Sequence, residues 1–187
     1  MSVVKAQTMQ QRFGFQDKEL TTPKHDEIML WLDGWLDMNI GAVVGETCTQ
    51  WDYVLVVPLY GANTRRSLNE FSSAELPEFP KPKINKKIWE CPVTDRNYTI
   101  GFIDMKVSYW IPGELYFYPE EKRFQAGVKE ISSYFEVKPS IPSLGEVIRQ
   151  IRMYQTYTSG RWFVVSPDAK FKAQLLAQGI GFVEVNQ

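Results

Sequence analysis

The chain has little of what redox and metal–sulfur sites depend on. Its 187 residues include two cysteines, Cys48 and Cys91, and a single histidine, His25. Two cysteines are too few for a disulfide framework, and these two lack the paired spacing of a zinc site. One histidine argues against multi-histidine metal centres and against serine–histidine hydrolysis. Carboxylates, lysine and a hard metal ion remain as means of catalysis.

An excess of charge and long apolar runs are also missing. The 21 basic and 22 acidic residues give a net charge of −1, so nucleic-acid contacts must come from local patches. No apolar run approaches the roughly 18 residues of a membrane helix, and the first 22 residues hold no apolar core of a signal peptide. Together with the few cysteines, these absences predict a cytoplasmic protein with no membrane contact.

The composition is that of an ordinary globular domain. Hydrophobic residues make up 44% and charged residues 23%, and the length fits one domain. We therefore expect a single domain over 1–187, with an N-terminal arm over 1–21. Residues 61–87 are rich in Ser, Pro, Asn and charge, which predicts an exposed insertion. Its lysines at 81–87 are expected to be solvated, with phosphate contact as the alternative.

The spacing of apolar residues predicts alternating helices and strands. Ile28, Trp31 and Leu32 begin an amphipathic pattern, and Thr22-Pro23 supplies a cap and a first helical residue. Further helices are predicted from 143 to 157 and over 169–178, strands over 53–57, 98–110, 114–118, 133–137, 162–165 and 182–185, and a turn at 112–113. This order predicts an α/β fold with a central mixed β-sheet flanked by helices.

An acid and a lysine close one of the predicted strands. Glu136 and Lys138 follow the apolar pair Tyr134-Phe135, and their side chains project to one face because strands repeat every second residue. We expect Lys138 to lie at the strand end, outside the core. A glutamate here can ligate a divalent ion while the lysine orients the attacking water.

A hard divalent ion requires a second carboxylate, and Asp104 is the best candidate. It lies inside an otherwise apolar strand, where an unpaired carboxylate is costly. An ion pair with Lys106 or a solvent-facing position is the alternative for Asp104. Asp104-Met105-Lys106 also offers the acid–lysine pattern in a competing register, which ranks lower because no helix follows it. If Asp104 points elsewhere, Glu114 or Asp52 becomes the candidate partner of Glu136.

These residues resemble a known family. Asp104 in an apolar strand, Glu136-Val137-Lys138 ending a later strand, and a helix with Gln150 and Tyr154 are similar to the PD-(D/E)XK nuclease superfamily. Within it, Gln150-Ile151-Arg152-Met153-Tyr154 resembles the Gln-x-x-x-Tyr element of the RecB-type branch. The resemblance covers residues 22–60 and 98–165 and implies a restriction-endonuclease-like core.

The resemblance also implies roles for the matching residues. Asp104 and Glu136 are expected to bind Mg²⁺ or Mn²⁺, and Lys138 to assist the water. Gln150 and Tyr154 are expected to help order the site and the DNA.

The resemblance also implies a third metal ligand, and the sequence departs from the pattern of the family at two points. Many members carry a glutamate on the first core helix, which maps onto Glu27. The 32 positions from Asp104 to Glu136 exceed the commoner spacing, so a hairpin must be inserted, near 114–118. The proline that often precedes the motif aspartate is absent.

Charged residues near the predicted site have two interpretations. Arg149, Arg152 and Arg161 flank it, and surface solvation and phosphate contact are equally favoured for them. His25, three residues into its helix, is expected to be a capping or surface residue.

These features predict a metal-dependent nuclease that hydrolyses DNA phosphodiester bonds. DNA is the expected partner, with RNA as an alternative and a homodimer left open. The alternative function is a catalytically inactive module of the same fold that binds nucleic acid or a protein partner, which the near-neutral charge favours. An enzyme of unrelated small-molecule chemistry is not supported, because the sequence has no phosphate-binding glycine loop and no Gly-x-Ser-x-Gly.

Overall fold

A computed structural model describes residues 23–45, 54–59, 62–67 and 81–186. The described residues form two compact units. Unit 1 comprises the described parts of Met1–Met38, Lys86–Val107 and Ser132–Gln187, and unit 2 those of Asn39–Asn85 and Ser108–Ile131. All residues of the predicted site lie in unit 1, apart from the alternative acids Glu114 and Asp52; Asp52 lies outside the described residues.

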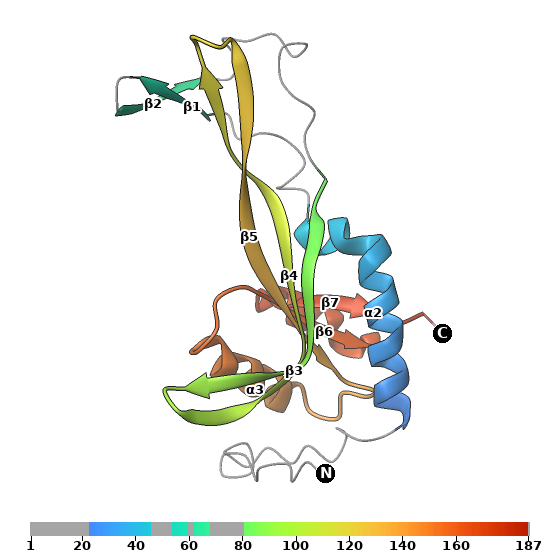
Figure 1. Ribbon diagram of the computed structural model, residues 1–187. Helices are drawn as coiled ribbons and strands as arrows, with labels where there is room; N and C mark the ends of the chain where they lie inside the picture. Colours follow the sequence, from blue (N-terminus) through green and yellow to red (C-terminus); the bar gives the residue numbers. More distant parts are fainter. Residues whose placement is uncertain (1–22, 46–53, 60–61, 68–80, 187) are drawn as a thin grey trace, which may run out of the picture. The chain divides into compact units, whose positions relative to one another are not determined.

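The described elements follow one another as helix, strands, helix, strand, helix and strand (Figure 1). They are α2 (Pro23–Val44), β1 (Val54–Leu59), β2 (Ala62–Ser67), β3 (Lys83–Asp95), β4 (Tyr98–Tyr118), β5 (Arg123–Val137), α3 (Leu144–Gln155), β6 (Arg161–Ser166), the 3-10 turn η3 (Ala169–Phe171), α4 (Lys172–Ala177) and β7 (Gly181–Glu184). The predicted α/β class is confirmed. Helix α2 begins at Pro23, as the Thr22-Pro23 pair predicts, and no helix of the described residues is long and apolar enough to cross a membrane.

The sheet of unit 1 is mixed, as the sequence predicts. Its strand order is β3-β4-β5-β6-β7. Short turns join β3 to β4 and β4 to β5, which makes these neighbours antiparallel. Strands β5, β6 and β7 are parallel, with Glu136 beside Val164 and Val164 beside Phe182. The residue pair that closes β5 therefore lies in a central strand of this sheet.

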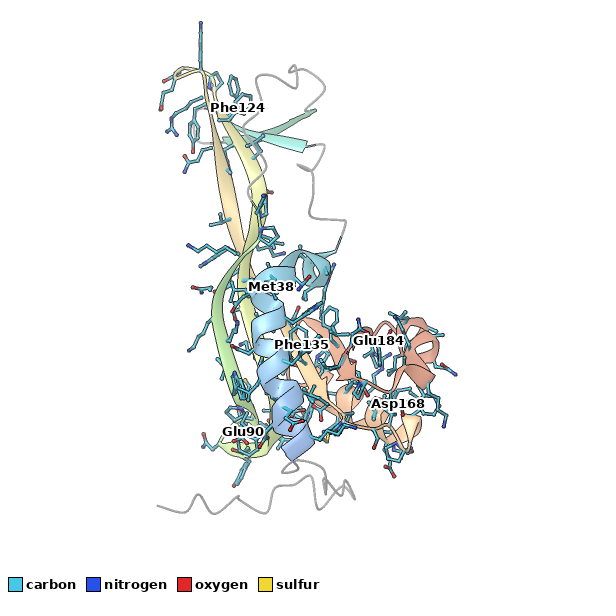
Figure 2. The ribbon with its side chains drawn as sticks, turned by 90° about the vertical axis from the view of Figure 1, so that its right-hand side faces the viewer. Met38, Glu90, Phe124, Phe135, Asp168 and Glu184 are labelled. Atoms are coloured by element: carbon cyan, nitrogen blue, oxygen red, sulfur yellow. The ribbon has the colours of Figure 1, made fainter. Side chains whose placement is uncertain are left out.

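Helices cover both faces of this sheet (Figure 1). On one face, α2 buries Ile28, Leu32 and Leu36, the spacing its sequence predicts. Phe135, labelled beside α2 in Figure 2, is also buried and stacks on Phe163 of β6 at 5.1 Å. Full burial of each such side chain contributes about 1.5–3 kcal/mol to folding.

Helix α3 packs on the opposite face. Its Ile151 and Tyr154 belong to an apolar cluster with residues of β4, β5 and β6. Trp162 of β6 stacks between Tyr134 and Tyr154, with ring centroids 5.0 and 5.8 Å away. This aromatic stack fixes the face of α3 that looks toward the end of β5.

Two segments differ from what the sequence patterns suggest. The insertion expected at 61–87 contains two regular segments, β2 and the start of β3, which pair with β1 and β4. Residues 68–80 lie outside the described residues. Pro112-Gly113 does not turn the chain, since β4 runs through both residues. Gly113 instead lies against the backbone of Gly127 on β5, which an ideal Cβ would meet at 3.5 Å.

The insertion required between Asp104 and Glu136 is a hairpin, longer than the sequence suggested. Strand β4 continues to Tyr118, a turn follows, and β5 returns from Arg123. The turn is closed by a hydrogen bond from the Lys122 backbone N–H to the Pro119 carbonyl, at 3.3 Å. Residues 108–131 of this hairpin belong to unit 2.

Candidate active site

Glu136 and Lys138 form a buried ion pair at the end of β5. Their side chains lie on one side of the strand, since Lys138 Nζ is 3.1 Å from Glu136 Oε1. Glu136 is 1% exposed and Lys138 6% exposed. The expectation that Lys138 lies outside the core is therefore wrong. The strand pairing continues through Lys138, whose backbone N–H donates to the Val165 carbonyl at 2.9 Å, and this holds the lysine inside the sheet.

Asp104 lies on β4, the strand adjacent to β5. Its Oδ2 accepts a hydrogen bond from the backbone N–H of Val137 at 2.7 Å. A carboxylate here replaces the strand carbonyl that would normally accept from this N–H. Asp104 therefore sits between the two strands, next to the backbone that carries Glu136, and not in solvent. Its buried position excludes the solvent-facing alternative.

His25 reaches the same carboxylate from α2. Its Nε2 is 3.4 Å from Asp104 Oδ1, and its Nδ1 is 3.3 Å from Asp26 Oδ1. The histidine is 6% exposed, so its expected capping or surface position is wrong. The sequence contained a sign of this, because His25 lies three residues before Ile28 and continues the apolar stripe of α2.

The environment of His25 raises its pKa. Burial acts to lower the pKa, but the hydrogen bond and negative charge of Asp104, followed by those of Asp26, outweigh burial. The net effect is an upward shift from 6.5. The imidazolium is thus the form that Asp104 favours.

Glu27 is not brought to this group. It is exposed, and it stands two residues beyond His25, about 200° further around the helix. The first helix therefore offers His25, rather than the glutamate that the resemblance implies, to the acidic residues of the sheet.

From the other face of the sheet, helix α3 supplies Gln150 and Tyr154. Gln150 is buried, and its Nε2 donates to Glu136 Oε1 at 2.7 Å. Tyr154 is fully buried, and its hydroxyl donates to the Phe102 carbonyl of β4 at 3.2 Å. One turn of α3 therefore holds both the glutamate and the strand that carries Asp104.

The three predicted arginines are exposed. Arg152 bonds within the chain: Nη2 donates to the Gln178 carbonyl and Nη1 to Gln155 Oε1, at 2.7 and 2.8 Å. It ties α3 to the end of α4. Arg149 lies on the outer side of α3, and Arg161 opens β6.

The polar group at the end of β5 consists of two buried acids and their cationic or polar partners. Removing such charges from water is costly, and their partners only partly offset the cost. Clusters of this kind are found preferentially at functional sites.

Asp104 and Glu136 each offer the ligand type of a hard cation. Carboxylate oxygens are the ligands that Mg²⁺ and Mn²⁺ prefer, and Mg²⁺ is commonly bound by one or two carboxylates together with water and substrate phosphates. Within the described residues, no three or more of His, Cys, Asp and Glu are grouped so as to hold a metal ion. Asp104 and Glu136 supply two carboxylates, so substrate and water would have to supply the remaining ligands of an ion held there.

Comparison of the chain with protein-family models, with curated proteins and with solved structures found no match.

Proposed function

We propose that the protein is a metal-dependent nuclease of the PD-(D/E)XK type, hydrolysing DNA phosphodiester bonds at the end of β5. One observation carries the proposal. Two buried carboxylates, Asp104 and Glu136, occupy adjacent strands, and Lys138 contacts Glu136 at 3.1 Å. A purely structural core has no need of this costly arrangement.

Asp104 and Glu136 are the residues that would hold Mg²⁺ or Mn²⁺. When bound, such an ion lowers the pKa of its water and neutralises charge that builds on the phosphate. Glu27 has no part in this proposal, because it is exposed on the far side of α2.

The chain's own residues orient the reacting groups. Lys138 holds its ammonium beside Glu136 Oε1, from which it can orient the attacking water. Gln150 fixes the same glutamate oxygen, and Tyr154 anchors β4 through the Phe102 carbonyl. Because these donors are buried and already bonded, they need little reorganisation when substrate arrives.

Phosphate contacts are assigned to Arg149 and Arg161. Both are exposed. Arg152, also exposed, bonds to the Gln178 carbonyl and to Gln155 Oε1. Since the net charge is −1, DNA binding must depend on such local cations and must weaken as salt rises.

The test is cleavage of labelled single-stranded, duplex and branched DNA with Mg²⁺ or Mn²⁺. The wild type is expected to cut at least one substrate, and chelator to abolish cutting. Lys138→Met should lower the rate at least 100-fold, the scale of a lost general acid–base or water-orienting group. Lys170→Met, at an exposed lysine, is the matched control and should cut like the wild type.

The inactive binding module predicts the opposite result. A wild-type protein that binds DNA but cuts none of these substrates with either metal would replace the nuclease with that module.

A further inference from the structure

The exposed apolar side chains of unit 1 divide by type. Among the large apolar residues described, the exposed aliphatic side chains of unit 1 lie on helices. The exposed large side chains on its parts of β3 and β4 are all aromatic. The exposed residues are Leu30, Met38, Trp89, Tyr98, Phe102, Tyr157 and Leu176. Three aromatic rings, those of Trp89, Tyr98 and Phe102, thus lie on two paired strands.

These strands form a hairpin that projects from the rest of unit 1 (Figure 1), marked by Glu90 in Figure 2. Its turn is Arg96-Asn97, and Arg96 adopts a positive φ of 52°. Tyr98, the first residue of β4, is 69% exposed. A tyrosine so exposed gains little from packing within its own chain.

Phe102 is the ring closest along the chain to the candidate active site. It stands two residues before Asp104, about 7 Å along the strand, which is about the span of one nucleotide. Side chains two residues apart on a strand project to the same side. The Phe102 ring is 36% exposed, although Ile103 and Asp104 beside it are buried. Its backbone is held by Tyr154, so the ring has a fixed support.

We propose that Phe102 and Tyr98 stack on bases of single-stranded DNA and so direct unpaired strands to Asp104 and Glu136. The proposal rests on the proposed nuclease function and names its substrate form. Aromatic side chains serve this purpose because every base has a π face, whatever its sequence.

Charge on the hairpin cannot supply the affinity. In the part of the hairpin that belongs to unit 1, Lys86 and Arg96 are exposed, but so are Glu90 and Asp95, and Lys87 is paired with Asp33 and Asp37. Because these charges balance, stacking must provide most of the binding at the hairpin. A duplex does not meet this requirement, since its bases are paired and stacked on one another.

The experiment measures binding of labelled oligo(dT) and of a blunt duplex by fluorescence anisotropy in EDTA, so that cleavage plays no part. Phe102→Leu keeps an apolar side chain and removes the π face, whereas Phe102→Tyr keeps it. We expect Phe102→Leu to weaken oligo(dT) binding about 5- to 100-fold, the effect of losing one base–aromatic stack. Phe102→Tyr should bind within about twofold of the wild type, and duplex binding should not change.

Two further variants protect the test against misfolding and non-specific loss. Tyr98→Leu alters a side chain that is mostly in solvent, so it should fold normally and still weaken oligo(dT) binding. Tyr157→Leu changes an exposed tyrosine outside the hairpin and should have no effect. Thermal melting of each variant checks the fold.

The inference is overturned if Phe102→Leu and Tyr98→Leu bind oligo(dT) like the wild type, if Tyr157→Leu weakens binding equally, or if duplex binding falls in parallel. The results distinguish a failure of this inference from a failure of the proposed nuclease function. A protein that binds oligo(dT) through these rings but never cuts loses only the nuclease, whereas one that cuts yet ignores the substitutions loses only the stacking role.

Discussion

Each acid at the end of β5 has a different kind of partner. Asp104 is held by a backbone N–H and by His25, and Glu136 by Lys138 and Gln150. Neither acid depends on solvent, because both are buried. These partners therefore determine how much it costs to keep Asp104 and Glu136 buried, and how strongly their carboxylate oxygens can bind a cation.

The protonation of His25 gives a direct measure of this group. The chain has one histidine, so its ring proton resonance in an NMR titration is unambiguous. We expect a pKa above 6.5, because Asp104 and Asp26 outweigh burial. Asp104→Asn should lower that pKa, since burial then faces only Asp26. Saturating Mg²⁺ should also lower it, because the cation competes with the imidazolium for Asp104.

The same shift sets a pH dependence of stability. The pKa of His25 is raised in the folded state. Its contribution to the free energy of unfolding is therefore fully present below about pH 6.5, and it is lost as the pH rises through the pKa of the folded state. Urea unfolding across this window should show the loss in the wild type and not in His25→Gln. A His25 pKa at or below 6.5 in the metal-free protein contradicts the pairing with Asp104.

Glu136 and Lys138 should be strongly coupled in stability. Breaking a buried ion pair by removing one partner costs about 3–5 kcal/mol, because the other charge stays buried. Lys138→Met and Glu136→Gln should each destabilise on this scale, and the double variant should lose less than the sum of the two. Urea denaturation measures the cycle. Two single variants within about 0.5 kcal/mol of the wild type would exclude a buried charged pair.

The sequence located the acids better than their partners. Glu136 and Lys138 were expected on one side of a strand because the period of two residues sets side-chain direction. His25 was overlooked as a partner, and Glu27 preferred, because the choice depends on which side of α2 meets the sheet. That choice is made by tertiary packing.

At the scale of whole elements, two glycines make contrasting predictions. Gly160, before β6, has a φ of 150°, and a Cβ there would lie 2.4 Å from the Ser132 carbonyl oxygen on β5. Backbone atoms cannot yield as a flexible side chain does. Gly34 lies within α2, and a Cβ there would meet nothing within 4 Å.

Gly160→Ala should therefore destabilise the protein by about 1–3 kcal/mol. Gly34→Ala should stabilise it by about 0.5–1 kcal/mol, because alanine has the higher helix propensity. Both values come from thermal or urea unfolding. Equal effects of the same sign would contradict the described packing of β5 against the start of β6.

Most elements could be predicted from periodicity, but the length of β4 and β5 could not. Pro112-Gly113 and the polar residues after Tyr118 are typical of turns and loops. The two strands nevertheless run on, since pairing between long neighbours satisfies backbone groups whatever the local propensity. Short-range patterns do not contain that information.

At the scale of the whole molecule, the length predicts one domain, whereas the described residues form two compact units. The candidate chemistry lies entirely in unit 1, and the hairpin inserted between Asp104 and Glu136 belongs largely to unit 2. The net charge of the chain is near zero. An overall positive charge therefore does not account for DNA binding. Local residues must determine where DNA binds.

The central claim is that Asp104 and Glu136 together bind a divalent cation. Its most direct test is anomalous X-ray diffraction from crystals of the wild-type protein soaked in Mn²⁺. We predict an anomalous peak in contact with both carboxylates, at ligand distances of about 2.0–2.5 Å, and its loss in Asp104→Asn. Crystals saturated with Mn²⁺ that show no peak between these carboxylates, or a peak held only by other residues, would contradict the account.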